Sequence, residues 1–436
     1  MFKKKKYIVI LIDGAADYRL AELGNRTPLQ VSRKPVIDYL ARNGIIGMVK
    51  TIPQGMSPGS DTANLAILGY DPRIYSSGRS SLEAVSIGVN LSENDTTFRC
   101  NLVTLSDEED YMSRIMVDYS AGEITTEEAR ILILDIAEKL ETEDIKFYPG
   151  VSYRHVIVWK NIQNDNKDSK SSKYSKYSKD SIGQNEKSVE DDFKLTPPHD
   201  ISGRKIKDYL PCGRYSDVIL NLMVGSSKLL MDHPVNKKRI KDGKRQANST
   251  WIWGKGKKPA LESFYKKYGI NGSVISAVDL IKGIGICAGL KPVNVEGATG
   301  NIHTNFLGKA NAVISEIRAG QDFVYLHIEA PDECSHQGNI NDKIRAIEII
   351  DEKVVKTVKE ALDEMDIDYR LMILPDHPTP IVKKTHTSEP VPFLIFKSRN
   401  IKEKPLQIYD EFYPVNNGVF IKEGYKLMDY FFDLSS

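Results

Sequence analysis

The sequence has few cysteines, no imbalance of charge and no dominant pattern of basic residues. Its four cysteines, Cys100, Cys212, Cys287 and Cys334, are scattered without a CxxC pair, which argues against a disulfide framework and a cysteine zinc site. Lys and Arg number 60 and Asp and Glu 59, a formal net charge of +1, so no global field points to nucleic acid. The cysteine usage favours a reducing compartment, and we expect the protein in the cytoplasm.

Long apolar runs are also missing. No stretch approaches the roughly 20 apolar residues that span a bilayer. The start, MFKKKKYIVILIDGAAD, imitates a signal peptide, but its apolar run YIVILI is only six residues long and stops at Asp13, which is too short for a signal sequence. We interpret YIVILI as a buried parallel strand. We therefore expect no membrane, no nucleic acid and no obligate protein partner.

Residues 161–195 contain mainly Lys, Ser, Asp and Asn, with almost nothing to bury. Such composition predicts a disordered surface loop. The functional alternative is a nucleic-acid-binding tail. Acidic residues are interleaved with the basic ones throughout the segment, which argues against that alternative. The whole chain, at 436 residues and 41% hydrophobic, is long enough for two domains around this loop.

Three apolar segments each lead into acidic and histidine residues. YIVILI stops at Asp13, DFVYLHIEAPDECSH runs into a predicted loop with Asp332 and His336, and YRLMILPDHPTP ends at Asp376 and His377. A further strand, VPFLIF, and a long segment with helical spacing of apolar residues accompany them. Strands alternating with helices predict a doubly wound α/β sheet. In such sheets chemistry gathers at the carboxyl ends of the strands.

The middle of the chain has a different pattern. EITTEEARILILDIAEKL predicts a helix capped by Thr125 or Thr126, and SYRHVIVW predicts a strand. The acid-bearing strands lie on both sides of this section. We therefore expect residues 91–275 to form a second domain inserted into a first, discontinuous one, residues 1–90 and 276–436.

Seven residues form a candidate site: Asp13, Ser60, Asp332, His336, Asp376, His377 and His386. Each has an ordinary explanation, because an acid after a strand commonly forms a turn or caps a helix. Together, three carboxylates and three imidazoles could hold two divalent metals through mixed oxygen and nitrogen ligands. Two metals roughly 4 Å apart can activate a nucleophile and stabilise a leaving oxygen. A serine hydroxyl such as that of Ser60 needs this help, since it is a poor nucleophile at neutral pH.

Six blocks also resemble a known family. IDG, PGSDTANLAILGYDPRIYSSGRSSLEA, SAVDLIKGIG, EAPDECSHQGN, LPDHPTP and THTSEPVPFLIF are similar to the cofactor-independent phosphoglycerate mutases, in the branch first recognised in archaea. That family lies within the alkaline phosphatase superfamily. The resemblance covers nearly the whole chain except about 161–195, and it implies an alkaline-phosphatase-like doubly wound sheet with an inserted α+β lid and substrate domain.

The resemblance also implies roles for the candidate residues. Ser60 would become phosphoserine, and the two metals would be bound by Asp332, His336 and His386, and by Asp13, Asp376 and His377 together with Ser60. Mn²⁺ is the expected metal, with Zn²⁺, Co²⁺ or Mg²⁺ as alternatives. The implied reaction interconverts 3-phosphoglycerate and 2-phosphoglycerate through Ser60, without 2,3-bisphosphoglycerate, and the inserted domain would exclude water.

Substrate-binding residues are harder to choose. Carboxylate and phosphate groups both favour Arg or Lys partners. Lys282 in DLIKGIG lies in one of the resembling blocks, and Arg154 and Arg214 are candidates from the inserted domain. Exposed solubilising charge is the alternative explanation for each arginine.

Two other functions stay open. A relative with the same serine and metal chemistry could act on another substrate, as a homoserine kinase-like enzyme or a phosphatase. The absence of a Walker loop does not exclude a kinase of this kind. A scaffold without catalysis is a further alternative, against which the intact Ser60 and ligand set argue. KGIGICAG lacks the GxGxxG spacing of a dinucleotide loop.

Overall fold

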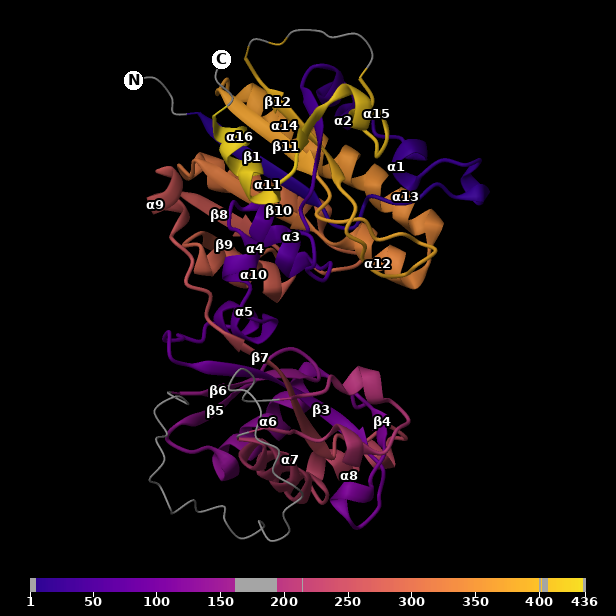
Figure 1. The fold of residues 1–436 in the computed structure, drawn as a ribbon, viewed down its shortest axis with the longest axis vertical. Helices are drawn as coiled ribbons and strands as arrows, with labels where there is room; N and C mark the ends of the chain where they lie inside the picture. The colour runs from indigo at the N-terminus through magenta and orange to yellow at the C-terminus, as the bar shows by residue number, and fades with distance from the viewer. Residues whose placement is uncertain (1–4, 161–193, 214, 400, 402–406, 434–436) are drawn as a thin grey trace. The chain divides into compact units, whose positions relative to one another are not determined.

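The computed structural model describes residues 5–160, 194–213, 215–399, 401 and 407–433. The chain divides into two compact units, residues 1–76 with 259–436 and residues 77–258 (Figure 1). The second unit starts before the predicted boundary because helix α5 (Arg79–Ser86) packs on its strand β7 (Ser249–Lys257). It ends earlier than predicted because strand β8 (Gly272–Ile275) pairs with a strand of the first unit.

The first unit is built on a sheet of eight strands among the described residues. In order across the sheet they are β13 (Val419–Ile421), β2 (Ile45–Val49), β12 (Val391–Lys397), β11 (Tyr369–Leu374), β1 (Lys6–Ile12), β10 (Phe323–Ile328), β8 and β9 (Lys291–Val293). β1 is parallel to both β10 and β11, and only β12 is antiparallel to its neighbours. The carboxyl ends of β1, β10 and β11 therefore meet at one edge of the sheet.

Helices cover both faces of this sheet, as the doubly wound prediction requires. The side chains of Ile8, Ile10 and Ile12 pack into a core shared with one group of helices. On the opposite face, Tyr7 of β1 packs against the rings of Phe431 and Phe432 in α16 (Leu427–Phe432). Strands buried on both faces explain why each reads as a continuous apolar run.

The helices of the first unit occur in two groups along the chain. Before the second unit they are α1 (Pro28–Val31), α2 (Pro35–Arg42), α3 (Ser60–Ile67) and α4 (Pro72–Tyr75). After it they are α9 (Phe264–Tyr268), α10 (Asp279–Cys287), α11 (Phe306–Arg318), α12 (Ala330–Gln337), α13 (Ile340–Ile349), α14 (Lys356–Glu364), α15 (Tyr413–Asn417) and α16 (Leu427–Phe432). A π-helical turn, Ile350–Val355, joins α13 to α14, so the long segment with helical spacing forms one nearly continuous helix.

The second unit combines an antiparallel sheet with helices. Its strands are β3 (Thr96–Leu105), β4 (Met116–Asp118), β5 (Ile145–Tyr148), β6 (Arg154–Trp159) and β7, and its longer helices are α6 (Thr126–Leu140), α7 (Ser216–Leu230) and α8 (Pro234–Lys241). As predicted, Thr125 caps α6, because its hydroxyl accepts the Glu128 N–H at 3.3 Å. The predicted loop 161–195 lies outside the described residues, apart from Lys194 and Leu195.

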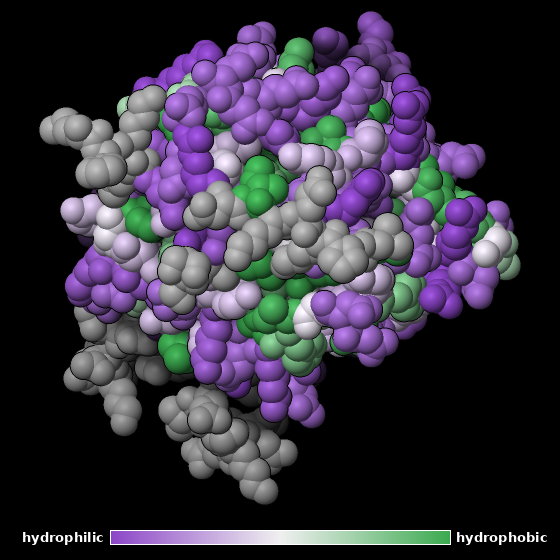
Figure 2. Space-filling view, turned by 90° about the horizontal axis from the view of Figure 1, so that it is seen from above, coloured by the Kyte–Doolittle hydropathy of each residue, from purple (hydrophilic) through white to green (hydrophobic). Residues whose placement is uncertain are grey.

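On the face seen in Figure 2 hydrophilic side chains predominate among the described residues, and apolar ones occur mainly near the middle of the view. Among the residues that the structure describes, no helix combines the length and the apolar character needed to cross a membrane.

A fully buried ion pair fastens the segment after β1 to the segment after β11. Lys343 of α13 donates to Asp17 at 2.7 Å and to the Thr379 carbonyl at 3.0 Å. Asp17 also accepts from the Ile381 N–H at 3.2 Å. Asp17 and Lys343 are both removed from water, so the charge of each side chain is compensated by the opposite charge of the other.

We predict that Lys343→Met lowers the free energy of unfolding by about 3–5 kcal/mol, because Asp17 would be left as an uncompensated buried charge. The matched control is Lys359→Met, which removes a part-exposed pair with Asp363 and should cost no more than about 1 kcal/mol. Urea unfolding of both variants measures the difference. Equal losses in the two variants would contradict the importance of the buried pair.

Candidate active site

Three carboxylates meet where the central strands end. Asp13 directly follows β1, and its N–H donates to the carbonyl of Ile328, the last residue of β10, at 3.0 Å. Asp376 follows β11 and Asp332 follows β10. All three side chains are buried. Because β11, β1 and β10 are neighbouring parallel strands, the acids that follow them converge at this edge of the sheet, as the sequence predicts.

Gly14 allows this convergence. Its backbone lies in the left-handed region at φ +62°, and a Cβ there would come within 2.5 Å of Asp332 Oδ1 and 2.7 Å of the Asp332 Cα. Its N–H donates to Asp376 Oδ1 at 3.2 Å. Position 14 therefore requires glycine, because a side chain there would collide with Asp332.

Asp332 and His336 form the more exposed half of the site together with His386. The predicted loop around Asp332 and His336 is instead helix α12, and their spacing of four residues puts both on one face of it. His336 Nε2 lies 3.1 Å from Asp332 Oδ2 and 3.0 Å from His386 Nε2. His386 Nε2 lies 3.5 Å from Asp332 Oδ1.

Ser60 and His377 form the other half with Asp13 and Asp376. Ser60 is the first residue of α3, and its Oγ lies 3.1 Å from His377 Nε2. The same nitrogen is 3.4 Å from Asp376 Oδ2 and 3.8 Å from Asp13 Oδ1. The two halves are adjacent, since the ring centres of His377 and His386 are 4.0 Å apart.

Hydrogen bonds fix which ring nitrogen faces the centre of the site. Thr379 Oγ1 donates to Asp332 Oδ1 at 2.5 Å and lies 3.2 Å from His377 Nδ1. Its lone pairs are thus available to the Nδ1–H of His377. His336 Nδ1 faces the Lys384 carbonyl at 2.9 Å, which also requires the hydrogen on Nδ1. In the neutral form, each histidine therefore directs the lone pair of Nε2 inward, as a metal ligand must. When His336 is protonated, its Nε2–H instead faces Asp332 Oδ2.

The charges at the site are unbalanced. Burial, together with the negative charges of Asp376 and Asp332, raises the pKa of Asp13 well above its usual value. Burial would also raise the pKa of Asp332, but hydrogen bonds from His336 and His386 outweigh it and hold that pKa well below the usual range. Asp13 Oδ1 is buried without a hydrogen-bond partner. A bound cation would satisfy this oxygen and relieve the repulsion between the acids.

The donor set fits divalent metal ions. Within the described part of the chain, three groups of side chains have ligand atoms within 4.8 Å of one another: Asp332, His336 and His386; Asp13, Asp332 and His377; and Asp13, His327 and Asp376. Mixed carboxylate and imidazole ligation suits Mn²⁺, Zn²⁺ and related ions. The first group coincides with one predicted ligand set, and the other two share Asp13 with the second.

The structure brings all seven predicted site residues together, whereas it does not test the predicted substrate-binding residues. Lys282 lies on α10 with its Nζ 3.2 Å from Asp279 Oδ1. Arg154 is exposed at the start of β6 in the second unit. Arg214 lies outside the described residues. Binding of substrate by these three residues stays a prediction.

Three residues of the site are not predicted from the sequence: His327, Asn64 and Thr379. His327 lies 2.9 Å from Asp13 Oδ2. Asn64 of α3 donates to Asp376 Oδ2 at 3.2 Å and accepts from the Tyr325 hydroxyl at 2.6 Å. Thr379 joins the two halves. A signal exists for His327, since it is the one imidazole inside the apolar run FVYLHI, but nothing local singles out Asn64 or Thr379.

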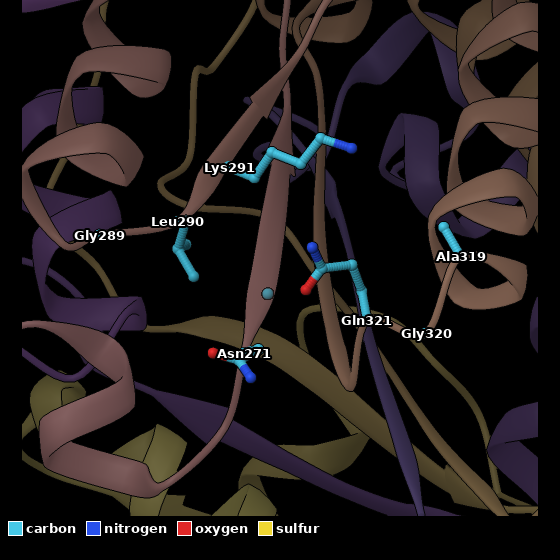
Figure 3. A pocket seen from close by; sticks show the side chains of 8 residues that line it. Asn271, Gly289, Leu290, Lys291, Ala319, Gly320 and Gln321 are labelled. Carbon is cyan, nitrogen blue, oxygen red and sulfur yellow. The ribbon is translucent and has the colours of Figure 1, made fainter.

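A separate hollow of about 470 Å³ lies at the other end of the strands, where β8 and β10 begin. Figure 3 shows Asn271, Lys291 and Gln321 around it, beside the turn at Gly320. Its lining contains no histidine or carboxylate, and the Nζ of Lys291 lies 2.8 Å from Glu316. This hollow therefore lacks the groups that the site above provides.

The amino-acid sequence was compared with family models and with known proteins, and both comparisons point to one family. Residues 41–236 match the family described as 2,3-bisphosphoglycerate-independent phosphoglycerate mutase. Proteins with that name from Methanothrix thermoacetophila and Methanosarcina acetivorans are each 44% identical to the chain. The first match covers 97% of this chain and 98% of its relative, and the second covers 93% and 94%. The chain belongs to this family.

Solved structures share the fold. A protein from Pyrococcus horikoshii has a TM-score of 0.76 at 26% identity, over 99% of this chain and 97% of its own. A cofactor-independent phosphoglycerate mutase from Thermoplasma acidophilum has a TM-score of 0.64 at 24% identity, over 99% and 100% of the two chains. The α/β fold class predicted from the sequence is thus confirmed.

We predict that Thr379→Val weakens the binding of Mn²⁺ by roughly 10- to 100-fold, because Thr379 orients Asp332 and His377 together. Thr379→Ser keeps the hydroxyl and should bind almost as the wild type does. The rise in Tm on adding Mn²⁺ reports this binding, since a ligand that binds only the folded protein stabilises it. An unchanged rise in the valine variant would show that Thr379 does not orient the ligands.

Proposed function

We propose that the chain interconverts 3-phosphoglycerate and 2-phosphoglycerate, with Ser60 as the temporary carrier of the phosphate and without 2,3-bisphosphoglycerate. The observation that carries the proposal is the position of Ser60 Oγ, 3.1 Å from His377 Nε2 and next to two candidate metal-ligand sets. The mutase names of relatives that match almost the full chain support the same reaction.

Two divalent metals are part of this proposal. Asp332, His336 and His386 would hold one, and Asp13, Asp376 and His377, with Ser60, would hold the other. When bound, the metals would lower the pKa of the Ser60 hydroxyl and neutralise charge on the phosphoryl oxygens. Mn²⁺ is the proposed metal, and Zn²⁺, Co²⁺ and Mg²⁺ are alternatives with the same ligand types.

The reaction needs two transfers. In the first, Ser60 gives up its hydroxyl proton and its oxygen forms a bond to phosphorus as the bond from phosphorus to O3 of the substrate breaks, and O3 gains a proton. In the second, O2 of the reoriented glycerate loses its proton and takes the phosphate, and Ser60 regains its hydroxyl. The start of α3 favours the negative phosphate, because the first N–H groups of a helix carry partial positive charge.

Water must be excluded while Ser60 carries the phosphate, or the phosphoenzyme would hydrolyse. We assign this role, and contacts with the glycerate, to the second unit. Arg154 is exposed on that unit, and its guanidinium lies 5.3 Å from the centre of the Tyr153 ring, so it is available to a carboxylate or phosphate. Lys282 of the first unit is the proposed phosphate partner.

The proposed location is the cytoplasm, where a glycolytic substrate would be available. The four cysteines, all free, are compatible with a reducing compartment. The substrate is a small molecule, and we propose neither nucleic acid nor an obligate protein as a partner. The homoserine kinase-like and phosphatase alternatives have no support among the relatives described above.

We predict that the purified chain with Mn²⁺ produces phosphoenolpyruvate from 3-phosphoglycerate when enolase is present and 2,3-bisphosphoglycerate is absent. EDTA should abolish turnover, and Ser60→Ala should lower kcat by at least about 10³-fold, since the nucleophile is removed. Ser57→Ala, in the same turn, is the matched control and should leave the rate nearly unchanged.

Continuous absorbance at the wavelength of phosphoenolpyruvate measures the rate. A Ser60→Ala variant as active as the wild type would remove Ser60 from the mechanism. No turnover with any of the four metals would refute the mutase reaction, and phosphate esters and homoserine with ATP would then be tested.

A further inference from the structure

His327 is the one histidine at the site that the proposed ligand sets leave out. It lies in β10, next to the last residue of the strand, and its side chain is fully buried. In the parallel register it pairs with Leu11 of β1. Because side chains two residues apart in a strand share a face, its imidazole reaches Asp13, two residues beyond Leu11.

The hydrogen bonds of His327 determine its tautomer. Its Nδ1 lies 3.2 Å from Ser276 Oγ, and Ser276 Oγ accepts the Val278 N–H at 3.0 Å. Ser276 Oγ still has its hydrogen and a second lone pair for Nδ1, so the contact at the other nitrogen decides the tautomer: an ionised Asp13 carboxylate only accepts, which puts the ring hydrogen of His327 on Nε2 and leaves Ser276 to donate to Nδ1. Nε2 lies 2.9 Å from Asp13 Oδ2, which accepts it.

This arrangement is the reverse of that at His336 and His377. Those two rings carry hydrogen on Nδ1, toward Lys384 and Thr379, and turn a lone pair toward the centre of the site. His327 instead turns an N–H toward a carboxylate. A ring nitrogen that carries hydrogen cannot bind a metal, so the tautomer separates His327 from the ligands.

Asp13 then has one oxygen committed and one available. Oδ2 accepts from His327, whereas Oδ1 is buried without a hydrogen-bond partner and lies 3.8 Å from His377 Nε2. We propose that His327 is a positioning residue that holds Asp13 Oδ2 through its Nε2–H, so that Asp13 presents only Oδ1 to a divalent cation. Ser276 fixes the tautomer that makes this possible.

This inference rests on the proposed metal centre. Residues that orient a metal ligand in this way typically change metal affinity by about 10- to 100-fold. The competing role is that of a ligand, because Asp13, His327 and Asp376 also lie close enough together to bind a metal. The two roles differ in what can replace the ring. A positioning residue needs only an N–H donor, whereas a ligand needs a nitrogen lone pair.

The test uses the full chain, freed of metal and titrated with Mn²⁺ by calorimetry without substrate. A His386→Ala background weakens the other ligand set, so that the remaining tight binding reports the Asp13 side. In that background His327→Phe should weaken binding by about 10- to 100-fold. His327→Gln supplies an amide N–H and should stay within about threefold of the background. Ser276→Ala, which keeps the ring, should give an intermediate loss.

Three outcomes would overturn the inference: His327→Gln as weak as His327→Phe, His327→Phe as tight as the background, or Ser276→Ala without effect. Circular dichroism and the Tm of the metal-free variants check folding, and the Gln and Ala variants decide the question if the Phe variant does not fold. Failure of the wild type to bind two Mn²⁺ would refute the metal centre. Two bound Mn²⁺ without mutase turnover would refute the proposed reaction and leave the role of His327 standing.

Discussion

The burial of three carboxylates at one edge of the sheet is the constraint on which the rest of the site depends. Asp13, Asp332 and Asp376 are each at most 5% exposed, and in such surroundings like charges cannot all be ionised without a compensating cation. In their neutral forms His336 and His377 carry hydrogen on Nδ1, so the lone pairs of their Nε2 atoms are available to a cation. The unpartnered Oδ1 of Asp13 is the remaining sign that this edge of the sheet accommodates metal.

Parts of the first unit that never touch substrate in our account follow from the same constraint. Gly14 has no side chain because Asp332 occupies the space that a Cβ would need. Lys343 and Asp17 fasten the segment after β11, and Thr379 in that segment orients one ligand from each half of the site. A structural ion pair and a catalytic arrangement therefore share one short piece of chain. Its stability and its geometry are expected to be lost together.

The sequence predicted the fold and the convergence of the acids because both depend on simple patterns. Continuous apolar runs predict buried parallel strands, and parallel strands deliver whatever follows them to a common edge. The sequence predicts a loop where α12 forms, since Asp332 and His336 closely follow a strand and α12 contains few apolar residues. His327, Asn64 and Thr379 were missed because their roles arise from contacts between segments far apart in the sequence, which no local pattern records.

The most direct test of the account is anomalous diffraction from crystals of the full chain grown with Mn²⁺. We predict two peaks roughly 4 Å apart, one bound by Asp332, His336 and His386, and the other bound by Asp376, His377 and a single oxygen of Asp13, next to Ser60 Oγ. A single peak, or a second peak remote from Ser60, would contradict the claim that the strand ends assemble a two-metal site around this serine.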